Sequence, residues 1–307
     1  MRQKILDKIQ QQIADNLYPG ASLALFSDGA WQEYYLGNAE DDLPTSQGMV
    51  YDLASVSKVV GVGTVLIELI QEGRVELDQS FQTYYPAFED SSVTIRQLIT
   101  HTSGIHPYIP NRDQLNAAEL KSAMHSLTVT EDKSFKYTDV NLILLGFMVE
   151  DLYGQSLDKI LQDKIFEPWG MTETSFGLRS GAVATVKEQP AGIVHDPKAR
   201  VLGVHCGSAG LFSTINDLEI FLLHYLQEEF AADLATNLST DKPRSIVWNI
   251  DEGEWLDHTG YTGPFIMVNR KAQKAAIFLT NRTYNYDDRP LWIEKCRELR
   301  DVIKANL

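Results

Sequence analysis

The chain has 307 residues, of which 44% are hydrophobic, so it is long enough to enclose a large core in one or two domains. Its 27 basic and 42 acidic residues leave a formal net charge of -15, which disfavours nucleic acid and anionic lipid surfaces as partners. The two cysteines, Cys206 and Cys296, lie far apart and outside any C-x-x-C spacing, which excludes a disulfide framework and a cysteine zinc cluster.

The N-terminal segment and the cysteine usage favour a soluble protein of a reducing compartment. Charged or amide side chains interrupt the first twenty residues every few positions, so this segment lacks the apolar stretch of a secretion signal. The most apolar window, Val59 to Ile70, contains Glu68 and falls short of the roughly 18 apolar residues that a membrane span needs. We therefore expect a cytoplasmic protein without a membrane span.

The N-terminal part is predicted to form a helix, a hairpin and a second, buried helix. Apolar residues recur at helical spacing between residues 5 and 17, and Pro19-Gly20 ends the pattern. The runs ASLALF and WQEYYLG flank the turn Ser27-Asp28-Gly29 and predict two paired strands. From Ser55 to Gln71 the pattern is helical and strongly apolar, and Gly73 supplies a C-terminal stop.

The rest of the chain divides into a helical middle and a strand-rich end. Residues 90 to 230 read mainly as helices separated by Gly and Pro loops. After Pro243 come three strand-like runs and an amphipathic segment: SIVWNI at 245–250, PFIMVNR at 264–270, KAAIFLTNR at 274–282 and residues 291–307. We therefore expect a discontinuous α/β domain of residues 1–55 and 243–307 that carries a mainly helical domain of residues 56–242.

The tetrad Ser55-Val56-Ser57-Lys58 stands at the start of the apolar helix. A three-residue step at about 100° per residue brings Ser55 and Lys58 to one face, so their side chains can touch. A serine hydroxyl needs a neighbouring base to act as a nucleophile, and a buried lysine can be that base. Ser156 and Ser239 also precede lysines by three residues, but no buried helix follows them. Taken alone, the tetrad is more simply explained by an ordinary helix start, since serine is a common cap.

A tyrosine turn lies inside the helical middle. Tyr137-Thr138-Asp139 comes directly before the apolar run VNLILLG. Alternate residues of a tight turn can face one cleft, and a tyrosine sharing a proton with Lys58 could deprotonate Ser55 and later protonate a leaving group. The simpler explanation of this motif is that Asp139 caps the helix while Tyr137 packs.

A third motif, His258-Thr259-Gly260, is followed by Tyr261-Thr262-Gly263 and a strand-like run from Pro264. Small residues on a strand edge let a substrate lie against the backbone, and an N–H just beyond them can donate to an oxyanion. By itself the motif is more simply explained by a glycine turn between strands with a solvated histidine.

The order of these three motifs resembles that of the serine β-lactamase and penicillin-binding protein superfamily, and the tyrosine variant is more similar to class C β-lactamases and their esterase relatives. Further stretches are similar to recurrent family segments: LITHTSGI at 98–105, IFEPWGMTETSFG at 165–177 and AGLFSTINDLEIF at 209–221. The resemblance spans nearly the whole chain. It implies a β-lactamase/transpeptidase-like fold of α/β plus all-α type, in which helices flank an antiparallel sheet, a helical domain is inserted, and the active site lies between the two domains.

The resemblance also implies residue roles. Ser55 would be the acylated nucleophile, Lys58 its proton acceptor, and Tyr137 the shared base and later acid. The backbone N–H groups of Ser55 and Tyr261 would form the oxyanion hole, and the substrate would lie against Thr259–Gly260. Water would then hydrolyse a covalent acyl-enzyme.

Two further site residues depart from the β-lactamase pattern. Asp139 stands where a class C enzyme usually has asparagine, and because a carboxylate can only accept hydrogen bonds, it would keep Lys58 charged and shift base catalysis to Tyr137. His258 stands in the catalytic strand motif where the true β-lactamases carry a lysine. At an unperturbed pKa of about 6.5 it is mainly neutral at pH 7. We therefore expect anionic β-lactams and peptides to be held less well.

These departures favour ester or amide hydrolysis, of an esterase or D-amino-acid peptidase kind, over antibiotic resistance. The alternatives are a β-lactam-hydrolysing or penicillin-binding enzyme, and a binding or sensing module that acylates once at Ser55 and stalls. The expected partner is a small ester, amide or lactam, with no cofactor, and residues 195–206 lack metal-ligand spacing. Ser208 is expected near the cleft, and His101 is expected to brace a loop. Oligomeric state is not readable from the sequence.

Overall fold

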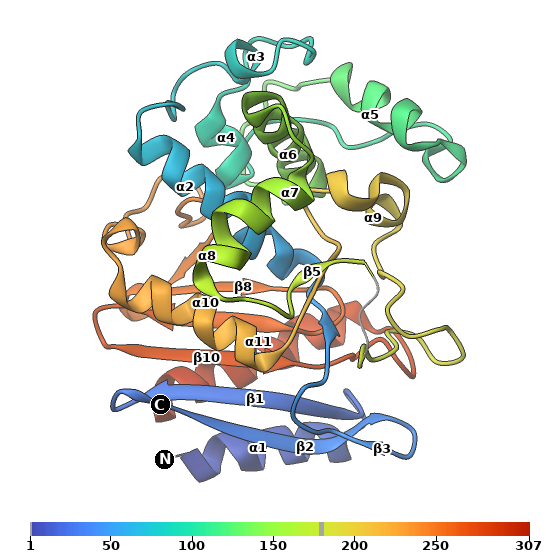
Figure 1. Ribbon diagram of the computed structural model, residues 1–307, viewed down its shortest axis with the longest axis vertical. Coiled ribbons are helices and arrows are strands. Elements are labelled where there is room, and N and C mark those ends of the chain that lie inside the picture. Colours follow the sequence, from blue (N-terminus) through green and yellow to red (C-terminus); the bar gives the residue numbers. More distant parts are fainter. Residues whose placement is uncertain (1, 178–180) are drawn as a thin grey trace.

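The computed structural model describes residues 2–177 and 181–307. Figure 1 shows a sheet with helices on both faces at the end of the molecule that holds the two termini, and a group of helices at the opposite end. The first and last parts of the chain, blue and red in the figure, build the sheet together. Segments far apart in the sequence therefore meet in one sheet.

Within the described residues, seven strands form an antiparallel sheet in the order β3-β2-β1-β10-β9-β8-β7, and three form a smaller sheet in the order β4-β6-β5. The larger sheet consists of β1 (Gly20–Ser27), β2 (Ala30–Glu40), β3 (Leu43–Pro44), β7 (Asn249–Asp251), β8 (Trp255–Thr259), β9 (Phe265–Asn269) and β10 (Lys274–Leu279). The smaller sheet consists of β4 (Tyr51–Asp52), β5 (Ser175–Phe176) and β6 (Leu211–Ser213).

The predicted N-terminal hairpin is present. β1 pairs with β2 from Gly20 to Ser27, and the two turn residues, Asp28 and Gly29, have φ angles of 55° and 79°. Left-handed backbone at both turn positions matches the right-handed twist of the flanking strands. The Asp-Gly pair therefore determines where the chain reverses.

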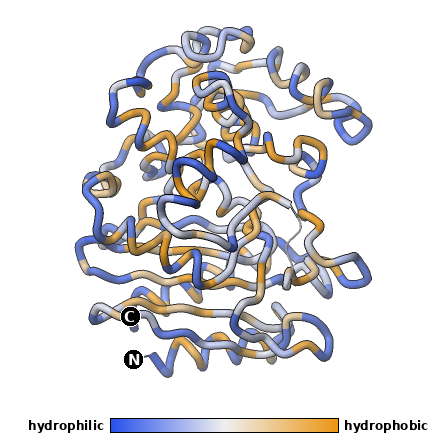
Figure 2. The backbone as a smooth tube through the Cα atoms, in the orientation of Figure 1, coloured by the Kyte–Doolittle hydropathy of each residue, from blue (hydrophilic) through white to orange (hydrophobic). Residues whose placement is uncertain are grey.

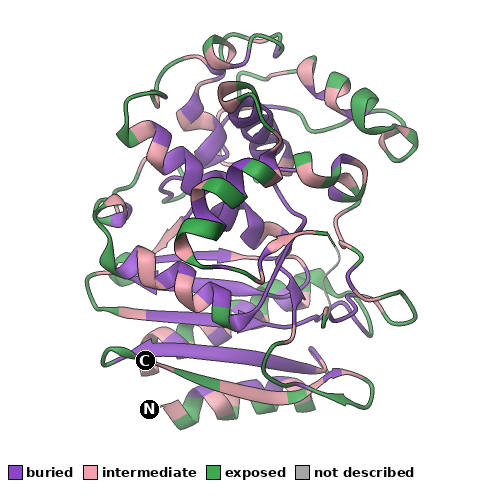
Figure 3. Ribbon diagram, in the orientation of Figure 1, coloured by how far each residue is buried: buried purple, intermediate pink, exposed green. Residues whose placement is uncertain are grey.

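Strand β1 is buried along its whole length because the sheet has a core on each face. Leu23 and Leu25 belong to the core formed with α1 (Arg2–Ala14) and α11 (Arg289–Asn306), whereas Ala24 and Phe26 belong to the larger core beneath the helical part. This division follows from the alternation of side chains along a strand. Figure 2 shows apolar stretches along the central strands, and Figure 3 shows the same strands as buried.

The helical part is built around α6 (Asp139–Tyr153), which is buried continuously from Val140 to Glu150. Its run VNLILLGFMV is apolar at nearly every position, as a helix enclosed on all sides requires. The other helices are α2 (Thr64–Gln71), α3 (Phe81–Tyr84), α4 (Ile95–Thr100), α5 (Ala117–His125), α7 (Leu157–Leu161), α8 (Glu167–Trp169), α9 (Pro197–Leu202) and α10 (Ile215–Gln227).

The division into a domain of residues 1–55 and 243–307 and one of residues 56–242 stays a prediction. Helix α10 lies in the second of these ranges but packs against β1, β9 and β10 of the large sheet. It therefore covers one face of the sheet, opposite α1 and α11.

The predicted helix from Ser55 to Gln71 begins irregularly. A 3-10 turn at Ala54–Val56 and a π-helical turn at Val59–Gly63 precede α2. By length and composition alone, the 18 residues Ala54–Gln71 would pass as a membrane span, so the expectation that no such window exists is wrong. In the folded chain 78% of this window is buried inside the protein, which is how a core helix is placed.

The strand predicted over residues 245–250 is mostly absent, because β7 begins only at Asn249. Val247 has a φ of 69°, and this left-handed residue turns the chain so that Arg244 forms a bridge with Asn249. Trp248 is fully buried at this turn. The apolar residues that read as a strand are thus explained by burial in the core.

A close approach of two backbones lies beside the start of β6. A methyl group added to Gly207 would lie 2.2 Å from the carbonyl oxygen of Leu142 and 3.1 Å from the Cα of Gly146, both on α6. Real Cβ atoms do not come this close to backbone, so glycine is required at 207. The contact fixes the following residue, Ser208, against α6.

We expect Gly207→Ala to lower the free energy of unfolding by about 2–3 kcal/mol, because the added methyl group overpacks a rigid backbone contact. Urea denaturation followed by circular dichroism measures the change. Gly61→Ala is the control, since its methyl group would meet the flexible ends of two side chains, Leu161 at 3.0 Å and Leu211 at 3.6 Å, and should cost less than about 1 kcal/mol. Equal stabilities of the two variants would contradict this explanation.

Candidate active site

The structure brings Ser55 and Lys58 into direct contact. Lys58 Nζ donates to Ser55 Oγ at 2.7 Å, one turn along the irregular start of the helix. Ala54 holds a left-handed φ of 46°, and its N–H donates to Asp52 Oδ1 at 2.8 Å, which stabilises the turn. Thr262, from the segment after β8, donates its hydroxyl to the carbonyl oxygen of Asp52 at 3.0 Å. The turn that contains Ser55 is therefore stabilised by a local contact with Asp52 and by a contact between Asp52 and the distant residue Thr262.

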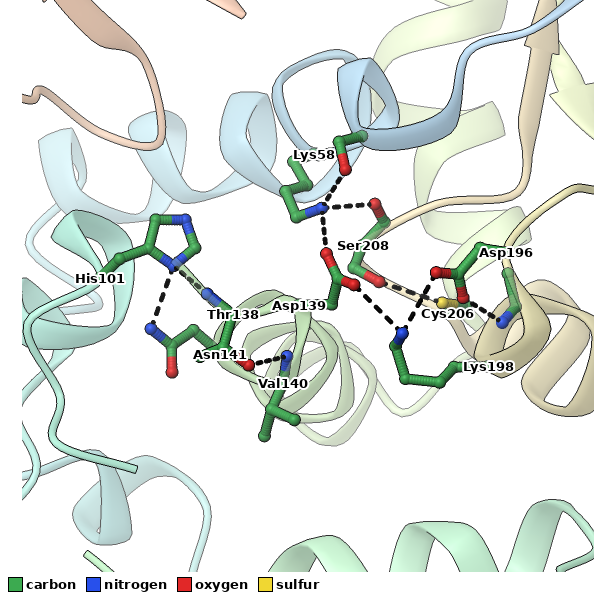
Figure 4. Close-up of polar contacts among 12 residues, drawn as sticks. Lys58, His101, Thr138, Asp139, Val140, Asn141, Asp196, Lys198, Cys206 and Ser208 are labelled. Carbon is green, nitrogen blue, oxygen red and sulfur yellow. Dashed lines mark hydrogen bonds and ion pairs between the residues drawn. The ribbon is translucent and has the colours of Figure 1, made fainter. Parts of the chain in front are cut away.

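Lys58 is fully buried and has three hydrogen-bond acceptors. Besides Ser55 Oγ, its Nζ donates to Asp139 Oδ1 at 2.8 Å and to the carbonyl oxygen of Ser208 at 2.9 Å (Figure 4). Burial alone would lower the pKa of Lys58, but the charges of Asp139 and Tyr137 outweigh it and raise the pKa above its ordinary value. Three acceptors match the three N–H bonds of an ammonium group, so Lys58 is charged in this arrangement.

Tyr137 lies over the amine of Lys58 and is partly open to solvent. The Lys58 Nζ is 5.2 Å from the centre of its ring, and 39% of the residue is exposed. On its other side the ring packs against His101, with 4.5 Å between ring centres. Nδ1 of His101 accepts from the side-chain amide of Asn141 at 3.2 Å, and burial lowers the pKa of His101 well below its usual range. A neutral His101 thus braces Tyr137 and the start of α6.

The third motif lies at the end of β8. His258 is buried, and burial together with the charges of Lys58 and Arg244 lowers its pKa well below the usual range. Thr259 lines the cleft, and a methyl group on Gly260 would lie 2.6 Å from the carbonyl oxygen of Leu53. Glycine at 260 thus lets the strand end approach the segment before Ser55. The histidine is buried, and the alternative of a solvated side chain is excluded.

These groups surround one cavity of about 830 Å³. Its lining includes the predicted site residues other than the fully buried Lys58: Ser55, Tyr137, Asp139, His258, Thr259, Gly260 and Tyr261. The Tyr261 ring stacks on His195 at 5.3 Å, and its carbonyl oxygen accepts from Arg282 Nε at 2.8 Å. The oxyanion-hole roles of the Ser55 and Tyr261 N–H groups stay predictions, as do the other residue roles.

Basic side chains outnumber acidic ones in the described lining of the cavity, although the chain carries a net charge of -15 and four of these basic residues form ion pairs with carboxylates: Arg112, Lys198, Arg282 and Arg300. Among the described residues that line it, two are acidic, Asp139 and Asp196, and seven are basic: Arg112, Lys198, Lys242, Arg244, Arg282, Arg289 and Arg300. Three of these arginines keep one buried guanidinium N–H without a hydrogen-bond partner in the described part of the chain: Arg244 Nε, Arg282 Nη2 and Arg300 Nε. Buried donors without a partner favour an anionic ligand.

Arg244 is a cation of the cleft that no sequence motif selects. It is 1% exposed, donates to Asn249 Oδ1 and to the carbonyl oxygen of Val247, and lies over the ring of Phe135 at 5.6 Å. Burial lowers its pKa to about 10, so it remains charged at neutral pH. No motif spacing links residue 244 to the other site residues, and only the turn at Val247 brings it to the cleft.

Residues 195–206 serve separate purposes in the structure. His195 stacks on Tyr261, His205 contacts Glu150 through Nδ1, and Cys206 Sγ lies 3.4 Å from Ser208 Oγ. No group of three or more His, Cys, Asp or Glu side chains in residues 2–177 and 181–307 is arranged to hold a metal ion. Ser208, which the sequence placed near the cleft, contributes its carbonyl oxygen to Lys58.

A family model described as Beta-lactamase matches residues 5–298. The chain belongs to the β-lactamase family. It is similar to a putative D-alanyl-D-alanine carboxypeptidase of Escherichia coli K12, at 23% identity over 91% of this chain and 82% of the relative. A protein of the same description in Salmonella typhimurium LT2 is 22% identical over 90% of this chain and 82% of its own length.

Solved structures share the fold. A class C β-lactamase superposes with a TM-score of 0.82 at 19% identity, covering 100% of this chain and 98% of the other. A β-lactamase/D-alanine carboxypeptidase from Pseudomonas syringae gives 0.81 at 18%, covering 99% and 98%. EstCE1, a hydrolase with promiscuous acyltransferase activity, gives 0.74 at 16%, covering 98% of each chain. The predicted family and fold class are confirmed, and the chain is a serine hydrolase of this family.

We expect His258 to make the folded protein less stable as the pH falls. Between about pH 6.5 and pH 5 the unfolded chain takes up a proton at this histidine while the folded chain does not, so stability falls by up to about 1.4 kcal/mol per pH unit. His258→Gln should therefore give a shallower loss of stability over this range, measured by urea denaturation at several pH values. The exposed His106→Gln is the control, and identical slopes for both variants would contradict a neutral, buried His258.

Proposed function

We propose that the chain cleaves ester or amide bonds through an acyl-enzyme at Ser55, and that its preferred substrates carry a carboxylate close to the scissile bond. The observation that supports this proposal is that Ser55 and Tyr137 line a cavity together with seven cationic side chains, while the buried Lys58 contacts both of them. The relatives named as putative D-alanyl-D-alanine carboxypeptidases support a peptide with a free C-terminal carboxylate as the substrate class.

Proton transfer in this mechanism runs through Tyr137. Lys58 is already an ammonium with three acceptors, so it is poorly suited to take a further proton from Ser55. Lys58 Nζ lies 5.2 Å from the centre of the Tyr137 ring, and a cation at this distance favours negative charge that develops on the phenol oxygen during the reaction. Tyr137 is therefore the group that exchanges protons with Ser55 and the leaving group.

The steps balance as two acyl transfers. With Tyr137 in its deprotonated form, Ser55 Oγ attacks the substrate carbonyl carbon while its proton passes to the Tyr137 oxygen, and the tetrahedral intermediate forms. The bond to the leaving oxygen or nitrogen then breaks as Tyr137 returns the proton to it, which leaves the acyl group on Ser55. Water attacks this ester, gives a proton to Tyr137, and Ser55 regains that proton when the acid departs.

Arg244 changes the expectation for anionic substrates. That expectation rested on His258, which is neutral and offers no charge. Arg244 is buried in the wall of the same cavity, it interacts electrostatically with both Tyr137 and His258, and its Nε has no partner in the described residues. A guanidinium group pairs well with a carboxylate. We propose that Arg244 supplies the positive charge that His258 lacks.

A slow or stalled module of the same fold is the second candidate. The hydrogen bond from Lys58 to Asp139 favours this candidate, because it keeps Lys58 protonated and leaves Tyr137 alone to transfer the proton of Ser55. Mass spectrometry after incubation with a fluorophosphonate and with a cephalosporin separates the two, since a persistent adduct without product release indicates a sensor. The cytoplasmic location and the absence of nucleic-acid partners stay predictions.

We expect Ser55→Ala to reduce hydrolysis of p-nitrophenyl esters at least about a thousandfold, because the acyl-enzyme can no longer form. Release of p-nitrophenol and mass-spectrometric labelling by a fluorophosphonate measure the loss. Ser57→Ala is the matched control, since Ser57 is buried and its hydroxyl accepts from the N–H of Leu211 at 3.2 Å. An unchanged rate in Ser55→Ala would refute the proposed nucleophile.

We expect Arg244→Gln to lower kcat/KM for an N-acyl-D-Ala-D-Ala peptide by about 10- to 100-fold, as loss of a charged hydrogen bond does. For the same peptide with a C-terminal amide, kcat/KM should fall by less than about threefold. The ratio of kcat/KM for the acid to that for the amide does not change if the variant is merely less stable, because both values then fall together. Arg74→Gln, at an exposed position outside the cavity, is the control. Equal losses for acid and amide would show that Arg244 does not recognise the carboxylate.

A further inference from the structure

Asp139 is bound by two lysines, one on each carboxylate oxygen. Oδ1 accepts from Lys58 Nζ at 2.8 Å, and Oδ2 lies 3.1 Å from Lys198 Nζ (Figure 4). Lys198 also pairs with Asp196 Oδ2 at 3.2 Å. The side chains thus form a row of alternating charge that starts beside Ser55 and ends at α9.

Lys198 is fixed in place by the start of α9. Pro197 is the first residue of the helix, and Asp196 caps it by accepting from the N–H of Ala199 at 2.9 Å. The N–H of His195 donates to Asp52 Oδ2 at 2.7 Å, while the other oxygen of Asp52 holds the turn before Ser55. One buried carboxylate therefore ties both the Ser55 turn and the segment that carries Lys198.

Lys198 faces the cavity as a charged donor. Its side chain is 13% exposed and lines the cavity with Ser55 and Thr259. Burial alone would lower the pKa of Lys198, but the charges of Asp139 and Asp196 outweigh it and raise the pKa, so the group is an ammonium. Two of its three N–H bonds point to these carboxylates, which leaves one for a ligand.

If the cleft is a hydrolytic site, a carboxylate at position 139 needs a positively charged hydrogen-bond donor beside it. Asp139 accepts hydrogen bonds but cannot donate one to a substrate, and its negative charge faces the cleft and holds Lys58. Lys198 neutralises that charge and adds a donor at the same place. The two side chains together offer what one amide group offers, an acceptor for Lys58 and a donor toward the cleft.

We propose that Asp139 and Lys198 act as one unit, in which Asp139 holds Lys58 while Lys198 shares that carboxylate and donates a hydrogen bond to a carbonyl oxygen on the acyl side of the substrate. This inference rests on the proposed function, because it takes Ser55 as the acylated residue. It adds Lys198 to the groups that contact the substrate.

The test compares Lys198→Met, Asp139→Asn and the double variant on two esters. One is a p-nitrophenyl ester of an N-acetylated amino acid, which has an acyl-side amide carbonyl, and the other is p-nitrophenyl acetate, which has none. We expect Lys198→Met to lower kcat/KM about 10- to 100-fold for the first ester and less than about fivefold for the second. In the double variant the amide introduced by Asp139→Asn supplies the donor and removes the uncompensated charge, so kcat/KM should return to within about threefold of Asp139→Asn alone.

Two controls keep the test decisive. Lys187→Met removes a lysine that pairs with Asp41 at 2.8 Å outside the cavity, and it should leave both rates unchanged. Lys198→Arg keeps donor and charge and should retain most of the activity, which covers the case in which Lys198→Met fails to fold. Three results would overturn the inference. The first is that the losses in kcat/KM from Lys198→Met and Asp139→Asn multiply in the double variant. The others are equal losses on both esters, and a loss in Lys198→Arg as large as in Lys198→Met. Loss of the proposed function itself would appear separately, as an unchanged rate in Ser55→Ala.

Discussion

The hydrogen bonds of the Lys58 ammonium group hold the cleft together. Taking a charge out of water is costly unless partners replace its hydration, and Lys58 is fully buried with three acceptors. These acceptors come from three separate segments: the turn of Ser55, the first residue of α6 and the loop before β6. Because each segment contributes one acceptor, each must be in place for the lysine to remain satisfied. The buried charge therefore determines the relative positions of the segments that meet at Ser55.

The distribution of charge matters more here than its sum. A chain with a net charge of -15 encloses a cavity in which basic side chains outnumber acidic ones. The overall charge acts over long distances and is screened by salt, whereas a cation in the wall of a cleft acts on a ligand at hydrogen-bond distance. The net charge of the whole chain therefore does not determine which ligand charge the cavity favours.

Local patterns were sufficient for much of the fold. The Asp28-Gly29 turn, the apolar run of α6 and the pairing of Ser55 with Lys58 each depend on spacings of a few residues. Residues 245–248 were predicted wrongly, because an apolar run reads the same whether it forms a strand or a buried turn, and Val247 adopts a left-handed backbone. The apolar window after Ala54 was predicted to be a buried helix, which is where it lies, although its length and composition alone would also fit a membrane span.

The remaining site residues could not be found from spacing. Lys198 reaches Asp139 from a short helix about sixty positions away, and Arg244 reaches the cleft only through the turn at Val247. Neither belongs to a motif, and their positions depend on how separately formed segments pack. Both nevertheless act on positions where the sequence departs from the family pattern, because Lys198 pairs with Asp139 and Arg244 interacts electrostatically with His258.

The hydrogen bond from the Thr262 hydroxyl to the Asp52 carbonyl oxygen joins residues 210 positions apart. A growing polypeptide exposes its serine and lysine early in synthesis, yet the strand that closes the pocket and the arginine beside it emerge only near the end. An incomplete chain on the ribosome therefore contains Ser55 and Lys58 without the strand and the arginine that complete the cavity around them. The cleft of such a chain is therefore completed late, once its final strands have been made.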